Sequence, residues 1–268
     1  MHASPTTLSH QRSAGAARAG FSLHSGQARL ATLRQQGSAK AIALDGGELV
    51  FLNTSGGLTS GDRLDYALTV GDGCRVTATT QTAERVYRAA DGEARITVQM
   101  DVGEGGHLDW LPQETILFQR GSARRRSIIT LGREATCLMA EALVLGRAAM
   151  GETVTELSFH DWREIQRDGA PVHLEVLRLD NDRLRQSAGG LADARAVASV
   201  VMVAPDAADA LGPVRAVLTE QGCRAAASAM GERLTIRLMA RDGFPLRRQL
   251  AQILTLLRRA PLPRVWQI

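Results

Sequence analysis

The sequence predicts a mostly β protein with layered or rolled sheets of many short strands, and about two α-helices in its C-terminal quarter. Short apolar segments recur roughly every 8–15 residues between positions 27 and 204, and turns rich in Gly and Asp separate them. After position 204 the apolar residues recur mainly at helical spacing. No fixed repeat length is visible, so the pattern does not predict a regular solenoid.

Three segments show the alternation of apolar and polar residues that is typical of a half-buried strand. They are 64–70, 74–81 and 94–102. The segment 49–52 is apolar throughout, which indicates a strand buried on both faces. We expect the remaining strands at 41–44, 107–111, 115–119, 126–131, 136–144, 153–159, 172–179, 197–204 and 234–238.

Two helical stretches are expected near the C-terminus. In the first, at 207–218, Pro213 predicts either a kinked helix or two short helices. In the second, at 246–257, leucines and an isoleucine mark one apolar face, Pro245 suits the first turn and Pro261 ends the helix. Since a helix of this length is marginal alone, its apolar face must be buried on the sheets or bind a partner.

The segment 53–62 is rich in glycine and small polar residues, which suggests a phosphate-binding loop at first sight. A Walker loop needs Gly-Lys-Ser/Thr, but Asp62 and Arg63 follow the last glycine. A dinucleotide loop needs a helix next, but the strand pattern of 64–70 follows. We therefore interpret the segment as a turn between two strands, with an anion site as the alternative.

The composition favours a cytoplasmic globular protein. The chain has 268 residues, 44% hydrophobic content and a net charge of +4, which allows a sizeable core. Its three cysteines lie far apart, which fits a reducing compartment, and no apolar run is long enough to span a membrane. Residues 1–20 are rich in Ser, Ala and Gly and are expected to form a flexible N-terminal tail, followed by a single domain at 21–268.

No pattern of residues indicates catalysis. Lys40 is the only lysine, the histidines do not stand at metal-ligand spacing, and no nucleophile elbow occurs. We therefore expect no catalytic residues and no tightly bound cofactor. The run 124–126 of three arginines is interpreted as a solvated loop, with an acidic partner as the alternative. Carboxylates in or beside apolar segments could form an acid–base pair or serve as turn groups, and these are Asp62, Glu114, Glu141, Glu152 and Glu175.

Five sequence blocks, taken together and in order, resemble the urease accessory protein family called UreD or UreH. The resemblance runs from about residue 20 to 268, and departures such as Ser60, where the family commonly has glycine, are small. The blocks are Leu52–Gly57 with Gly61–Leu64, Thr79–Arg88, Asp109–Phe118, Leu145–Glu152 and Leu262–Trp266.

The resemblance implies a non-enzymatic scaffold with sheets in a helicoid-like stack, so that residues 21–268 form a UreD-like domain. Family members bind the helical adaptor UreF, which recruits the GTPase UreG, and the assembly docks on urease apoprotein to promote nickel insertion. Neither nucleic acid nor a membrane is expected as a partner. Transient passage of nickel through an internal channel is also implied, and candidates for its lining are Asp62, Thr80, Glu114, Glu141 and Glu175.

Two readings from other classes stay open at this point. One is a hydrolase that uses two of the carboxylates on a β scaffold. The other is a β-rich carbohydrate-binding module. The segment 108–118 is a separate open point: it could be two strands joined by a turn at Pro112, or it could place Gln113 and Glu114 at an interface or in a channel.

Overall fold

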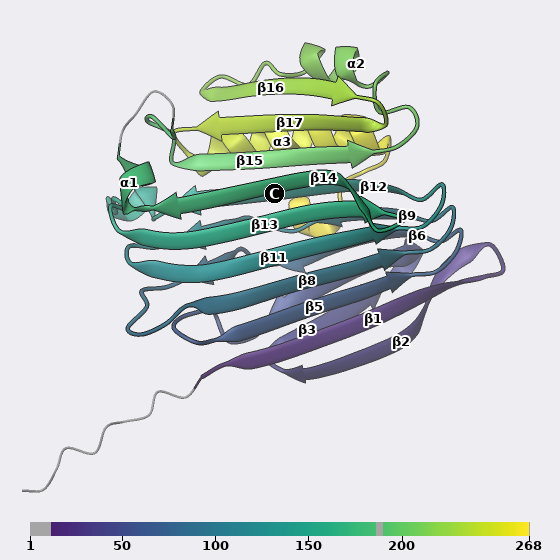
Figure 1. Cartoon of the computed structure of the whole chain (residues 1–268), viewed down its shortest axis with the longest axis horizontal. Coiled ribbons are helices and arrows are strands. Elements are labelled where there is room, and N and C mark those ends of the chain that lie inside the picture. The colour runs from purple at the N-terminus through teal and green to yellow at the C-terminus, as the bar shows by residue number, and fades with distance from the viewer. Residues whose placement is uncertain (1–11, 186–189, 268) are drawn as a thin grey trace, which may run out of the picture.

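The computed structural model describes residues 12–185 and 190–267. Two large β-sheets lie one in front of the other, and we call them the front sheet and the back sheet (Figure 1). The front sheet contains, in spatial order, β14 (Ala170–Asp180), β13 (Leu157–Arg167), β11 (Gly121–Leu131), β8 (Ala94–Val102), β5 (Arg63–Val70), β1 (Ala14–His24) and β2 (Gln27–Gly37).

The back sheet extends beyond the front sheet at one end, where two helices accompany it (Figure 1). Its strands, in spatial order, are β16 (Cys223–Met230), β17 (Arg233–Ala240), β15 (Ala196–Val203), β12 (Thr136–Leu145), β9 (His107–Leu111), β6 (Arg75–Gln81), β4 (Glu48–Asn53) and β3 (Ala39–Leu44). The short strand β10 (Thr115–Leu117) pairs with β12, and the short strand β7 (Glu84–Val86) pairs with β10. The helices are α1 (Asn181–Leu184), α2 (Leu211–Ala216) and α3 (Gly243–Arg258), with 3-10 turns at Asp45–Gly47, Ala148–Met150 and Arg264–Trp266.

The central part of the molecule is a β-solenoid of about four turns. From β4 to β13 the chain passes alternately through the back and the front sheet, and successive strands within each sheet pair in parallel. Arg63 pairs with Arg95, 32 residues on, whereas Ala94 pairs with Ala123, 29 residues on. Because the turns differ in length, no repeat is visible in the sequence. The sequence pattern therefore did not predict the solenoid, whereas the expected stack of sheets is confirmed.

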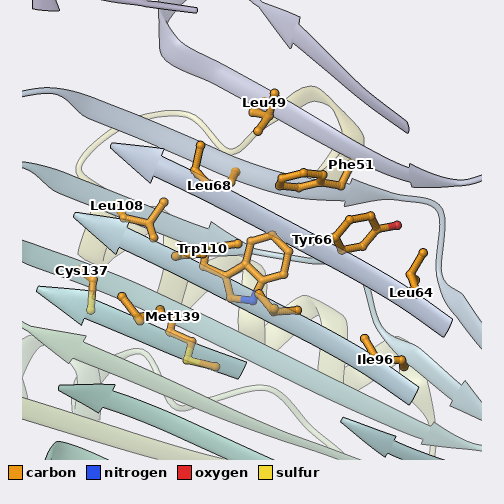
Figure 2. Close-up of a cluster of buried hydrophobic side chains, with 14 of the residues drawn as sticks. Leu49, Phe51, Leu64, Tyr66, Leu68, Ile96, Leu108, Trp110, Cys137 and Met139 are labelled. Carbon is orange, nitrogen blue, oxygen red and sulfur yellow. The ribbon is translucent and has the colours of Figure 1, made fainter. Parts of the chain in front are cut away.

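The main hydrophobic core lies between the two sheets (Figure 2). Phe51 from β4, Tyr66 from β5 and Trp110 from β9 meet there, with ring centroids 4.6 Å apart for Phe51 and Tyr66 and 6.2 Å apart for Phe51 and Trp110. The inward residues are those that the alternation in the sequence assigned to a single face of each strand. Aromatic residues are scarce in this chain, so aliphatic side chains fill the rest of the core.

A second core lies on the outer face of the back sheet, under α3. Leu250, Ile253 and Leu254 of α3 are buried against β12, β15 and β17. Asp242 caps the helix by accepting a hydrogen bond from the Phe244 N–H at 2.8 Å. The predicted amphipathic helix is confirmed, and its apolar face is buried on the sheet.

Three local expectations differ from the structure. Residues 14–20 form the first half of β1 and not a tail, because pairing with β2 and β5 compensates for a segment rich in Ala and Gly. Residues 1–11 of that expected tail lie outside the described residues. The single domain expected at 21–268 stays a prediction. In the stretch 207–218 only 211–216 is helical, with Pro213 in its first turn. The Ala-rich strand β16 has little intrinsic β propensity, so the sequence pattern missed it.

Candidate functional site

A polar cavity of about 60 Å³ lies between the two sheets, close to β7 and β10. It has room for a few water molecules, at about 10–15 Å³ for each. Leu64, Tyr66, Ile96 and Trp110 form part of its apolar wall (Figure 2). Its polar wall comes from strands and turns far apart in the sequence, and includes Asn53, Thr80, Glu84, Gln113, Thr115, Arg125 and Glu141.

Glu141 is the most deeply enclosed carboxylate of this cavity, with 2% of its surface exposed. Its strand β12 is covered on one face by the front sheet and on the other by α3, so nearly every residue of the strand is buried. Glu141 Oε1 accepts a hydrogen bond from Trp110 Nε1 at 3.0 Å. Its Oε2 lies 2.7 Å from Arg125 Nη1 as an ion pair, without the alignment of a hydrogen bond. The pair compensates a negative charge that would otherwise be costly to bury.

Arg125 begins a chain of buried ion pairs that leads away from the cavity. Its Nε and Nη2 donate to the two oxygens of Asp161 at 2.9 and 2.6 Å. Arg163 donates to Asp161 Oδ2 from Nε at 2.8 Å, and its Nη1 lies 3.3 Å from Glu175 Oε2. Burial by itself would raise the pKa of Asp161, but the charges and hydrogen bonds of the two arginines outweigh burial and lower it.

The far end of this chain opens into a wider cleft of about 930 Å³ between β14 and the strands β15 and β17. Arg163, Glu175, Ser199 and Arg237 lie on its wall. Glu175 Oε1 accepts a hydrogen bond from Arg237 Nε at 2.9 Å. Alternating charges therefore connect the enclosed cavity to an open cleft through the interior of the molecule.

The three consecutive arginines of β11 show how strand geometry separates them. The pattern of β11 alternates strictly, so Arg124 and Arg126 face solvent while Arg125 points inward and is only 5% exposed. The expected solvated loop was therefore wrong for Arg125, and 124–126 is strand. Asp161 and Arg163 of β13 were missed for a related reason. They share the inward phase of Phe159 and Ile165, but the predicted strand 153–159 covered only the first three residues of β13. The inward phase of charged residues in each strand was the available signal.

A second carboxylate of the cavity, Glu84, was not among the sequence candidates. Asn53 Nδ2 donates to its two oxygens at 3.2 and 3.1 Å. Burial raises the pKa of Glu84, and hydrogen bonds from the Arg85 N–H and from Asn53 partly offset that rise. Burial, and then the charge of Glu84, also raise the pKa of Tyr66. The cavity wall thus holds two carboxylates of different character: Glu141, paired with an arginine, and Glu84, held mainly by neutral donors.

The structure brings together only two of the five lining candidates, Thr80 and Glu141, in this cavity. Glu175 lies at the far end of the ion-pair chain, in the cleft. Glu114 lines a groove beside α3 and is 3.2 Å from Arg247. Asp62 is buried outside the cavity, and its two oxygens accept hydrogen bonds from the N–H groups of Ser13 and Thr59, each at 2.8 Å.

The glycine-rich segment 53–62 is the turn between β4 and β5, as the sequence predicted. Asp62 closes it through Thr59, and Asn53 Oδ1 accepts from the Ser55 N–H at 3.1 Å. Gly57 has φ +143°, and a Cβ there would lie 2.9 Å from the Arg85 carbonyl oxygen, so only glycine fits. Through Asn53, Gly56 and Gly57 this turn also forms part of the cavity rim.

Glu152 is the remaining carboxylate that the sequence placed in or beside an apolar segment. It accepts hydrogen bonds from the Gln119 N–H at 3.2 Å and Arg147 Nε at 3.0 Å, and it does not line the cavity. Gln113 does line it, and its Oε1 accepts from Arg247 Nη1 at 2.8 Å. No group of three or more potential metal-ligating His, Cys, Asp or Glu residues occurs within the described ranges. In the same part of the chain, no helix is long and apolar enough to cross a membrane.

The family model described as "UreD urease accessory protein" matches residues 13–267. The chain belongs to the UreD family. It is 55% identical to the urease accessory protein UreD of Cereibacter sphaeroides strain ATCC 17025, over 96% of both chains. It is 49% identical to the UreD of Paracoccus denitrificans, over 96% of this chain and 93% of the relative. The UreD of Rhizobium etli is 40% identical, over 98% of each chain.

UreD proteins are non-enzymatic accessory proteins that take part in urease maturation and nickel metallocentre assembly. Membership of this family confirms the resemblance in the sequence and implies association with the urease maturation machinery. The hypothesis of a hydrolase was therefore wrong, and urease maturation takes the place of the hypothesis of a carbohydrate-binding module. The polar cavity and its ion-pair chain must serve binding, transfer or stability, since the family performs no chemistry of its own.

His173, on β14 near the cleft, should make the folded state sensitive to acid. Burial lowers its pKa from 6.5 to about 4; the charge of Glu175 opposes this shift, and Arg233, Arg237 and Arg163 add to it. The unfolded chain takes up this proton at a higher pH, so the stabilising contribution is complete above pH 6.5 and disappears as the pH falls toward 4.

We expect His173→Asn to lose less stability than the wild type over this pH window. Urea unfolding of both proteins at several pH values between about 4 and 7.5 would measure the difference, because His173 titrates within this range. Each protein is compared with itself at the upper pH, so that any constant cost of the substitution cancels. Parallel loss of stability in the two proteins would show that His173 does not contribute.

Proposed function

We propose that this UreD protein is a scaffold that binds a UreF-type adaptor and, through it, a UreG-type GTPase, and that it docks on urease apoprotein to promote nickel insertion. Membership of the UreD family along residues 13–267 is the observation that carries the proposal. We also propose a cytoplasmic location, which free cysteines at 74, 137 and 223 support. In this assembly the GTP chemistry belongs to the partner, and this chain contributes binding surfaces and an interior route.

The cavity between the sheets is the proposed station for nickel in transit. Thr80, Glu84 and Glu141 offer hydroxyl and carboxylate oxygens around it. Such ligands bind divalent nickel less tightly than thiolates or clustered imidazoles, and an ion in transit must be released again. Cys74 and Cys137 are buried elsewhere in the core and do not line the cavity. The chemistry of the lining thus suits passage better than storage.

The ion-pair chain supports a role for Glu141 beyond simple lining. Arg125 shares its charge between Glu141 and Asp161, and a divalent cation near Glu141 would compete with this guanidinium. Glu175 in the cleft stands at the other end, and Glu114 lies in the outer groove. Both oxygens of Asp62 already accept hydrogen bonds, one from Thr59 in its own turn and one from Ser13 just before β1. We therefore assign Asp62 a structural part and keep Thr80, Glu114, Glu141 and Glu175 on the proposed route.

Co-expression of the urease operon with and without this gene tests the proposal. The wild-type gene should raise the nickel content and activity of purified urease. Glu141→Gln should keep the hydrogen bond from Trp110 but lose the charge, and should lower nickel content about tenfold, as is typical when a group that holds or orients a metal is lost. Nickel per urease active site, measured by atomic absorption, is the readout.

A matched control separates transfer from folding. Glu156→Gln changes an exposed carboxylate that pairs with Arg120 and should leave nickel content unchanged. Both variants must be recovered in the co-purified complex in wild-type amounts. Equal nickel content in urease made with wild-type and Glu141→Gln protein would remove Glu141 from the route. Full nickel loading without this gene would contradict the proposed function as a whole.

A further inference from the structure

The back sheet extends beyond the edge of the front sheet, and its last strands there have one uncovered face. Figure 1 shows β17 and β16 past β14, with α3 behind β17, and we call residues 223–230 and 233–240 the overhang. The outer face of the overhang is buried under α3 through side chains such as Leu234 and Ile236. On its inner face, which continues the side of the back sheet that lines the main core, no residue is buried.

The edge of the front sheet beside the overhang is also open. In the described part of the chain, β14 pairs with β13 alone, and the cleft of about 930 Å³ runs along its residues 174–179. Leu174 and Val176 point away from the core and are 49% and 47% exposed, and Val176 is the direct partner of Trp162 on β13. A long open edge of this kind can pair with an additional strand from another protein.

The inner face of the overhang is basic. β16 and β17 contain three arginines and no Asp or Glu. The pairing of β16 with β17, and of β17 with β15, places Arg224, Arg233 and Arg237 on the same inner face. Because these strands supply no carboxylate of their own, the arginines depend on neighbouring segments for compensation.

That compensation is incomplete. Each of the two carboxylates that meet arginines of the overhang is shared with a second arginine. The groups are Glu175 with Arg163 and Arg237, and Asp193 with Arg224 and Arg241. Positive charge therefore remains in excess along this face, and acidic side chains from outside would be attracted to it.

The geometry of the cleft defines which segment fits. Neighbouring strands lie about 4.8 Å apart and packed sheets about 10 Å apart, so a strand added to β14 would lie in front of β17. Its inward side chains would point toward Arg237 and its neighbours on the overhang. Its outward side chains would extend the apolar row of Trp162 and Val176. Since successive side chains of a strand alternate between faces, the fitting segment alternates acidic and apolar residues.

We infer that the β14 edge and the overhang bind, by strand addition, an extended segment of urease apoprotein that alternates acidic and apolar residues. The inference rests on the proposed function, because the proposed nickel route opens into this cleft at Glu175. Among the described residues, Glu175 is the one carboxylate of that route paired with two arginines. A cation is held least firmly there and would leave toward its recipient, which is the apoprotein.

A second copy of this chain fits the cleft poorly. Its own open edge strand, β14, presents a single carboxylate, Glu175, among its inward residues. One carboxylate does not compensate the arginines of the overhang, whereas an alternating acidic segment supplies several.

The first test measures binding of the full chain to purified urease apoprotein by biolayer interferometry. Arg224→Gln/Arg237→Gln removes two arginines that are 64% and 65% exposed, and Asp193 and Glu175 each keep one arginine. The affinity should fall about fivefold or more at low salt, and added salt should weaken binding less than in the wild type.

Arg29→Gln/Arg34→Gln is the matched control for charge. These arginines are exposed on β2, at the opposite end of the front sheet, and the change in net charge is equal. The control should bind apoprotein like the wild type.

Leu174→Thr/Val176→Thr tests the contribution of the edge strand. Threonine keeps a β-branched side chain that suits a strand, but it replaces apolar contact area by a hydroxyl. The affinity for apoprotein should fall about fivefold. Leu30→Thr/Leu33→Thr, at partly exposed leucines of β2, is the matched control and should leave the affinity unchanged.

A peptide probe tests the form of the occupant. A synthetic peptide of about eight residues that alternates Val and Glu should compete with apoprotein for the wild-type protein. A peptide that alternates Val and Lys should not compete, because the overhang repels it. Thermal unfolding checks the fold of each variant, and if a variant is unfolded, the competition with the wild type decides.

Wild-type affinity in either test variant, an equal loss in its control, or no competition by the acidic peptide would overturn the inference and leave the proposed function intact. Weaker binding to the purified adaptor with unchanged binding to apoprotein would also overturn it, and so would a dimer in light scattering that the test variants abolish. Failure of the wild type to bind apoprotein would overturn both the inference and the proposed docking on urease.

Discussion

Arg125→Met should lower the free energy of unfolding by about 3–5 kcal/mol, the range observed when one partner of a buried ion pair is removed. Arg125 is the only described residue that pairs with both Glu141 and Asp161, at 2.7 and 2.6 Å. Glu141 is 2% exposed and Asp161 is fully buried, so water cannot replace the lost guanidinium. Arg163 would still compensate part of the charge of Asp161. Glu141 would have only Trp110 as a donor.

The neighbouring arginine provides the control. Arg124→Met removes an exposed guanidinium that pairs with Glu93 on the surface, and should change stability by less than about 1 kcal/mol. Urea denaturation of the two variants and the wild type gives both values. Combining Arg125→Met with Glu141→Gln should recover part of the loss, because the second substitution removes the uncompensated charge. Equal effects at positions 124 and 125 would show that the buried network has no special importance.

Trp266→Ala should lower the free energy of unfolding by about 3–5 kcal/mol, as is typical when a buried aromatic side chain is removed. Trp266 lies in the last 3-10 turn, is 6% exposed and donates from Nε1 to the Leu111 carbonyl oxygen at 2.9 Å. The Arg247 guanidinium lies 4.8 Å from the centre of its ring. Through these contacts, the C-terminal segment fastens α3 to the end of β9, next to the Gln113 side of the cavity.

Phe244→Ala is the matched control, because this aromatic residue of α3 is 68% exposed and should contribute little. Thermal or urea unfolding distinguishes the two variants. The yield of the complex with the adaptor is a second measurement. It should fall with Trp266→Ala, because the substitution loosens the attachment of α3 to the sheet. If Trp266→Ala were as stable as the wild type, the C-terminal segment would not contribute to the stability of the fold.

The sequence anticipated features that depend on neighbours along the chain. Alternation located β5, β6 and β8, and the helical spacing of leucines located α3. Turn chemistry identified the glycine-rich segment as the β4–β5 connection. Strands β1 and β16 escaped detection because Ala and Gly have no clear local preference for strand, and pairing with neighbours alone makes them extended.

The candidate site was only partly accessible in this way. Thr80 and Glu141 were selected by family resemblance, and their common cavity appears only once β6, β9 and β12 are aligned. Glu84 and Arg125 carry no local signal that separates a buried charged residue from an exposed one, beyond the phase of their strands. Asp62 and Glu114 were equally good candidates by sequence, yet one closes a turn and the other pairs with Arg247 at the surface.

By itself the sequence determined the class of fold, the family, the amphipathic helix and the turn at 53–62, because each is encoded in short-range patterns or in ordered blocks. Only the tertiary structure decided which polar side chains meet. Arg125 and Asp161 stand 36 residues apart and share two hydrogen bonds because β11 and β13 pair in one particular register. That register depends on the unequal lengths of the solenoid turns and on the packing of two sheets, and both are long-range properties that no local pattern contains.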